Sequence, residues 1–314
     1  MTQYDFRGIR ADNLVAFMAA LGTLRVSTMF WPDLDPRLAW SEQEDGWSAT
    51  LRLNDAASQD EFIAQLHAYL AAQSSAPAIN IADDLTISSP DFHTILDSAR
   101  SKAKANASAR TEIDFLAAFG SDAVESKTGG KPTGNIADTS FRTMSGAGHQ
   151  HFLGTMRTII GGTTEQHLKK ALFSTWTYTD PMQNHSLRWD PNDDIRYALQ
   201  WTEPSKDNDR KKKGCVWGAY RLAIEALPLF PTAPQADRLA TTGFSNDRRD
   251  VEFTWPVWDQ FIDLDTSASL VALAKLKSQS LDRVELAKRG IQEIFRCRRI
   301  TQGKFRNFTS ARPV

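Results

Sequence analysis

Short runs in which apolar and polar residues alternate constrain the fold of this chain most strongly. Residues 37–40 and 47–53 alternate around a Glu-Asp-Gly turn, and residues 239–244 and 251–258 form a second such pair. Runs of this kind predict antiparallel strands joined as hairpins. Because the strands come in hairpins and do not alternate one by one with helices, the sequence predicts an α+β fold, with helices packed on antiparallel hairpins or a sheet.

Helical periodicity defines most of the other elements. Apolar residues recur at helical spacing over residues 12–29, where Asp12 or Asn13 can cap the helix. Gly22 inside this helix costs about 1 kcal/mol relative to Ala and is tolerated if another backbone packs closely there. Further helices are predicted at 60–72, 89–107, 111–119, 151–160, 163–173, 217–227, 267–277 and 281–296, and further strands at 187–189 and 196–201.

Residues 120–145 differ in composition from the rest of the chain. They are rich in Ser, Gly, Thr and Lys and contain few apolar residues, which predicts a long exposed loop. A chain of 314 residues is long enough for one large domain or two smaller ones. The domain prediction is an N-terminal α+β lobe at 1–119, a flexible loop or linker at 120–145, and a C-terminal α+β lobe with a basic tail at 146–314.

Composition limits the cellular setting. The apolar stretches are too short to cross a bilayer, and the first residues lack the apolar core of a secretory signal. Cys215 and Cys297 are far apart and have no metal-ligand spacing, so a disulfide scaffold is not expected. These features predict a cytoplasmic protein that has no membrane association.

No catalytic motif is recognisable, and we expect no cofactor, no metal and no enzymatic activity. His149 and His151 flank Gln150 without a nearby cysteine or carboxylate to complete a ligand set, and a structural zinc ion needs four ligands. A metal-dependent nuclease stays open as an alternative, because carboxylates near a lysine can bind Mg²⁺ beside a phosphate. Its candidate residues are Asp114, Glu125 and Lys127, or Asp190, Asp193 and Asp194.

Basic residues are concentrated near the C-terminus although the net charge is only −1. Between Arg283 and Arg312 there are nine basic residues against Glu285 and Glu293, an excess of seven. Arginine and lysine neutralise phosphates, and aromatic rings stack on unpaired bases. We expect nucleic acid to contact Arg296, Arg298, Arg299, Lys304, Phe305 and Arg306, assisted by Lys211, Lys212 and Lys213. The alternative is a tail anchored on the core by its aromatic residues, with the arginines simply solvated.

Several segments are similar as a set to those of a known family: Asn13–Arg25, Ser186–Pro191 with Arg196–Ala198, Glu225–Pro231, Thr241–Phe244 and Phe253–Trp258. Together they resemble accessory and large-subunit-like proteins of bacterial type I-G (I-U) CRISPR systems. The resemblance implies a non-enzymatic subunit of an antiviral ribonucleoprotein, which contacts DNA or guide RNA and neighbouring protein subunits. We therefore expect a nucleic-acid-binding subunit, with a metal-dependent nuclease or a purely structural, protein-docking subunit as alternatives.

Overall fold

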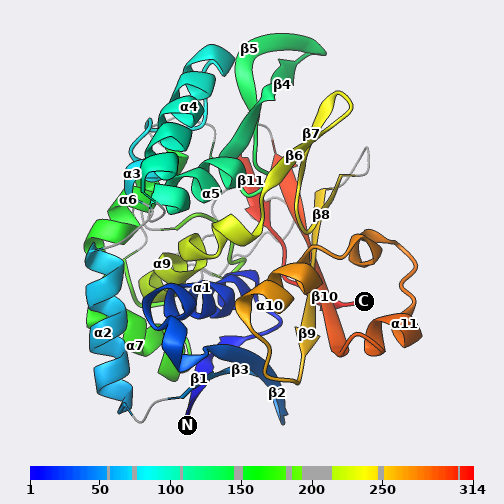
Figure 1. Cartoon of the computed structure of the whole chain (residues 1–314). Coiled ribbons are helices and arrows are strands. Elements are labelled where there is room, and N and C mark those ends of the chain that lie inside the picture. Colours follow the sequence, from blue (N-terminus) through cyan, green and yellow to red (C-terminus); the bar gives the residue numbers. More distant parts are fainter. Residues whose placement is uncertain are drawn as a thin grey trace.

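A computed structural model describes residues 1–54, 57–72, 76–106, 109–144, 151–181, 186–192, 214–246, 251–302 and 305–314. The predicted α+β class is confirmed, since helices pack around strands that pair antiparallel (Figure 1). No helix within these ranges combines the length and the apolar character that a bilayer span requires.

Two sheets and two hairpins make up the described strands. The first sheet has the order β1 (Thr2–Arg10), β3 (Gly46–Leu53), β2 (Arg37–Gln43). The second has the order β11 (Phe305–Phe308), β10 (Ile291–Gln302), β9 (Val251–Trp258), β8 (Phe244–Asn246), and β12 (Arg312–Pro313) also pairs with β10. The separate hairpins are β4 (Gly120–Thr128) with β5 (Lys131–Asp138) and β6 (Thr232–Gln235) with β7 (Arg238–Thr241).

The α-helices are α1 (Leu14–Phe30), α2 (Gln59–Ala72), α3 (Ala76–Ile79), α4 (Ser89–Ala105), α5 (Arg110–Phe119), α6 (Phe152–Gly162), α7 (Glu165–Phe173), α9 (Trp217–Glu225), α10 (Leu264–Val271) and α11 (Arg283–Ala287). The described residues also form the 3-10 helices η1 (Pro32–Leu34), η5 (Leu227–Leu229) and η6 (Ala274–Lys277).

Helix α1 lies at the centre of the molecule. Every residue from Leu14 to Ser27 is buried, as expected for a helix that is apolar on all sides. The predicted cap is confirmed, since the Asn13 side chain accepts a hydrogen bond from the Ala16 N–H at 3.1 Å. The close approach expected at Gly22 is also present: a Cβ atom there would lie 1.8 Å from the Leu222 carbonyl oxygen of α9.

The prediction of a flexible loop over residues 120–145 is wrong. Strands β4 and β5 form a hairpin whose turn contains Gly129 and Gly130, both at positive φ. The hairpin extends from one end of the molecule (Figure 1), so most of its side chains are at least partly exposed and need not be apolar. The residues that follow, from Thr139 to Met144, are buried and belong to the body of the protein.

The predicted lobes share one hydrophobic core in the described part of the chain. A single cluster of buried side chains includes residues from both 1–119 and 146–314. Helices α1 and α9, one from each predicted lobe, pack against each other. Tryptophan contributes strongly to this core, as expected, and Trp40, Trp189, Trp255 and Trp258 are fully buried.

Three further differences concern single elements. Strand β1 precedes the predicted opening helix and was not expected. The predicted helix 281–296 ends early, because Gly290 adopts a positive φ and residues from Ile291 onward pair with β9. Residues 187–189 form no strand in the structure, and the strand predicted at 196–201 lies outside the described residues.

Candidate nucleic-acid interface

Strand geometry divides the basic tail between two faces of the second sheet. Successive side chains of a strand point to opposite faces. Arg296 and Arg298 therefore lie on one face of β10, and Arg299 lies on the other. Arg299 is paired with Phe308 of β11, so Arg306, two residues before Phe308, shares the face of Arg299. The structure thus brings Arg299 and Arg306 together and separates them from Arg296 and Arg298.

Arg296 has a structural role. It is 5% exposed, and its guanidinium donates hydrogen bonds to the Thr254 hydroxyl at 2.9 Å and to the Ser278 carbonyl at 2.7 Å. A further bond reaches the Leu276 carbonyl at 3.2 Å, and Glu252 lies 3.7 Å away. These contacts attach η6 to the sheet and leave the guanidinium inaccessible to a phosphate, which was not evident from the sequence.

Arg299 and Arg306 both donate to the backbone of the buried segment Thr139–Met144. Arg299 Nη1 lies 2.6 Å from the Ser140 carbonyl oxygen, and Arg306 Nη1 lies 3.3 Å from that of Arg142. Among the described residues, neither guanidinium forms an ion pair with a carboxylate, and the buried Arg299 Nε has no hydrogen-bond acceptor. Burial, with a smaller contribution from the charge of Arg306, lowers the pKa of Arg299 to about 10, although the charge of Asp138 opposes this shift.

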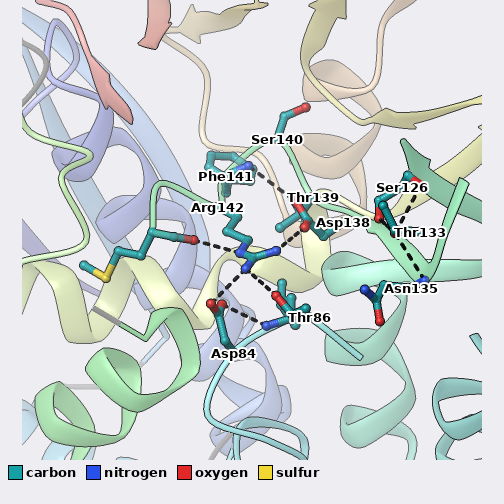
Figure 2. A network of polar contacts seen from close by, with 12 residues as sticks. Asp84, Thr86, Ser126, Thr133, Asn135, Asp138, Thr139, Ser140, Phe141 and Arg142 are labelled. Carbon is teal, nitrogen blue, oxygen red and sulfur yellow. Dashed lines mark hydrogen bonds and ion pairs between the residues drawn. The ribbon is translucent and has the colours of Figure 1, made fainter. Parts of the chain in front are cut away.

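Arg142, in the same buried segment, forms ion pairs with two carboxylates. Figure 2 shows its guanidinium between two carboxylates, with Nη2 2.8 Å from Asp84 and Nη1 2.5 Å from Asp138. Nη2 also donates to the Thr86 hydroxyl at 2.9 Å. Arg142 therefore has two carboxylates in direct contact, whereas Arg299 and Arg306 form no ion pair among the described residues.

The other predicted contact residues are only partly placed. Arg298 is exposed on the opposite face of β10, and its backbone N–H donates to the Thr309 hydroxyl at 3.1 Å. Phe305 begins β11, and the placement of its side chain is not described. Lys304 and the three lysines Lys211, Lys212 and Lys213 lie outside the described residues.

A cavity that sequence reasoning missed lies at the start of α1. Its volume is about 440 Å³, and its walls come from β1, the first turn of α1, residues 175–178, residues 191–192 and residues 309–311. Chemically distinctive lining residues are Arg7, Arg10, Asp12, Asn13, Trp176 and Tyr178. Alternation of Tyr4 and Phe6 with Asp5 and Arg7 was the available signal for β1, but nothing local indicates which distant segments complete the cavity.

Asp190 joins three residues of the cavity wall. Its buried carboxylate accepts hydrogen bonds from Asn13 Nδ2 at 2.9 Å, from the Tyr178 hydroxyl at 2.9 Å and from the Asn192 N–H at 2.8 Å. Burial raises the pKa of Asp190 above its ordinary value, although these three donors oppose the shift. Asp190 therefore holds Asn13, Tyr178 and Asn192 in place in the cavity wall. Asp193 and Asp194 lie outside the described residues.

The polar contacts of the nuclease candidates do not join them into a site. Asp114 pairs with Arg110 at 3.1 Å, and Lys127 pairs with Asp237 at 2.8 Å. Glu125 accepts from the Gly134 N–H at 3.1 Å within its own hairpin. Across the described residues, no group of three or more His, Cys, Asp or Glu side chains is arranged to hold a metal ion. His149 lies outside these residues.

Comparisons with protein-family models, with curated proteins and with solved structures find no match to this chain.

Proposed function

We propose that this protein is a non-catalytic nucleic-acid-binding subunit of a CRISPR-type antiviral ribonucleoprotein. The observation that carries the proposal is the pair Arg299 and Arg306, which share one face of the second sheet without a carboxylate partner among the described residues. The sequence resemblance to type I-G CRISPR proteins supports the proposal that the protein belongs to such a complex. It also supports the proposed partners, which are DNA or guide RNA and other protein subunits.

Charge balance explains why a phosphate suits this pair. Desolvation penalises the Arg299 cation and the like charge of Arg306 adds to that cost, as the lowered pKa of Arg299 indicates. A backbone phosphate between the two side chains would supply the missing negative charge and accept charge-assisted hydrogen bonds. Contacts of this kind bind nucleic acid without reading its sequence.

Binding across a salt series tests the proposal. Labelled single-stranded DNA, duplex DNA and RNA are titrated with the protein in the presence of Mg²⁺, and a gel reports cleavage. We expect intact substrate and an affinity that falls steeply with salt, because phosphate contacts release counterions. Arg306→Glu should weaken binding at least about tenfold and reduce the salt slope by about one or more.

Arg238→Glu is the charge-matched control, since Arg238 is an exposed strand arginine in the β6–β7 hairpin. It should bind like the unchanged protein. If Arg238→Glu and Arg306→Glu lose the same amount of nucleic-acid affinity, Arg299 and Arg306 do not form a specific phosphate contact. Cleavage that requires Mg²⁺ would favour the nuclease alternative, and a co-purifying protein without nucleic-acid affinity would favour the docking subunit.

A further inference from the structure

We infer that the cavity at the start of α1 binds a nucleotide, with its phosphate at Arg7 and its base beside Trp176 and Tyr178. This site uses none of the residues of the arginine pair, so it goes beyond the proposed function and stands or falls separately. The common chemistry is a phosphorylated nucleoside, either free or at the end of a strand.

Arg7 supplies the cation of this cavity. It is an exposed residue of β1, and its guanidinium has no ion pair or hydrogen bond with any described residue. The neighbouring Arg10 is different, because its Nη1 lies 2.5 Å from Asp45 and 3.3 Å from the Ser48 hydroxyl. Arg10 and Asp45 pair with each other, so Arg7 is the one cation of the lining that has no ion pair among the described residues.

The first turn of α1 forms part of the same wall. Leu14 and Ala16 line the cavity, and the Ala16 N–H is already occupied by the Asn13 cap. The Leu14 N–H has no intrahelical acceptor, as in the first turn of any helix, and the positive end of the helix favours an anion. Asp12 is the one lining carboxylate without an ion pair among the described residues, and its charge opposes a bound phosphate.

Trp176 and Tyr178 supply ring surface. Their polar groups are engaged elsewhere: Trp176 Nε1 donates to the Ala171 carbonyl at 2.8 Å, and the Tyr178 hydroxyl donates to Asp190 at 2.9 Å. The two ring centroids lie 6.2 Å apart in an edge-to-face arrangement. Both rings are half-buried and line the cavity, so they are held in place with surface left for a base.

Size restricts the ligand to one nucleotide unit. A volume of about 440 Å³ falls within the range of small-molecule sites, and a folded nucleic acid cannot enter it. The combination of an unpaired arginine, the N-terminal turn of a helix and two anchored rings matches a phosphate joined to an aromatic base better than it matches a simple anion.

Calorimetric titration of the full chain with adenosine 5′-monophosphate (AMP) and with adenosine tests the site. We expect saturable binding of AMP and binding of adenosine at least about tenfold weaker, because charge-assisted phosphate contacts are lost. Arg7→Ala should weaken AMP binding by a similar factor, and Asp12→Asn should strengthen it. Arg238→Ala is the control and should leave AMP binding unchanged.

Competition identifies the source of the nucleotide. If an oligonucleotide with a 5′-phosphate displaces AMP and its 5′-hydroxyl form does not, the site takes a strand end. If neither displaces AMP, it takes the free nucleotide. No saturable AMP binding at millimolar concentration, or equal binding of adenosine and AMP, would overturn the inference.

Arg306→Glu separates this inference from the proposed function. That variant should lose oligonucleotide affinity and keep AMP affinity. Oligonucleotide binding that depends on Arg306 without any AMP binding would overturn the nucleotide site alone. AMP binding that depends on Arg7, without oligonucleotide binding, would overturn the proposed function alone.

Discussion

Gly22 determines how closely two helices of the core approach. A Cβ atom at this position would overlap the Leu222 carbonyl oxygen at 1.8 Å, and backbone cannot move aside as a flexible side chain does. Gly22→Ala should therefore destabilise the protein by about 3 kcal/mol, even though alanine favours a helix. Chemical denaturation measures this loss.

Gly161→Ala is the matched control, because Gly161 lies in α6 and a Cβ atom there would meet nothing within 4 Å. It should be neutral or slightly stabilising. If both variants unfold at the same denaturant concentration, the close helix approach is not a constraint.

Asp190 makes stability depend on pH with a defined sign. Burial raises its pKa in the folded state, so the folded protein binds this proton more tightly than the unfolded chain does. The free energy of unfolding should then fall as pH rises from the ordinary pKa of about 4 through the folded-state value. Asp190→Asn should remove this part of the pH dependence, as measured by urea unfolding at several pH values.

Identical slopes for Asp190→Asn and the unchanged protein would show that the Asp190 carboxylate does not titrate differently on folding.

At the scale of elements, α1 and α9 are joined by a buried ion triad. Glu225 lies 3.0 Å from Arg25 of α1 and 2.6 Å from Arg221 of α9, and all three side chains are buried. Glu225→Gln removes the shared anion and leaves two buried cations, which should cost about 3–5 kcal/mol in unfolding free energy. Glu165→Gln, at an exposed position of α7, should cost little. A loss below about 1 kcal/mol for Glu225→Gln would contradict this role.

Periodicity predicted elements well where each element has its own apolar face. Helices α1, α2 and α9, the β2–β3 hairpin and the Asn13 cap lie close to their predicted positions. Prediction failed where pairing with a distant strand decided the conformation. Residues 291–296 can satisfy a helical pattern, yet they form β10, because they pair with β9 along their length and with β12 at Phe295 and Arg296.

At the scale of the molecule, the shared core predicts cooperative unfolding. Side chains from both sides of residues 120–145 lie in one cluster, so neither side can lose its packing independently. Thermal unfolding followed by calorimetry and by tryptophan fluorescence should give one transition at one temperature. Two separated transitions, each assignable to one side of the β4–β5 hairpin, would contradict a shared core.

The candidate sites were predictable only in part. The cluster of basic residues predicted nucleic-acid contacts in the C-terminal tail, and Arg299 and Arg306 remain candidates for such contacts. The same charge pattern also included Arg296, which proved to be buried and bonded. Charge counts do not report which face of a strand a residue occupies or what covers that face.

The sequence by itself determined the class of the fold, the central helix with its cap and glycine, and the region of excess basic charge. These depend on periodicity and on interactions within a few residues. Only the tertiary structure decided that residues 120–138 form a hairpin, that β10 divides the tail arginines, and that Arg7 meets Trp176 in one cavity. The reason is that burial and ion pairing depend on segments far away in the chain, whose positions no local pattern records.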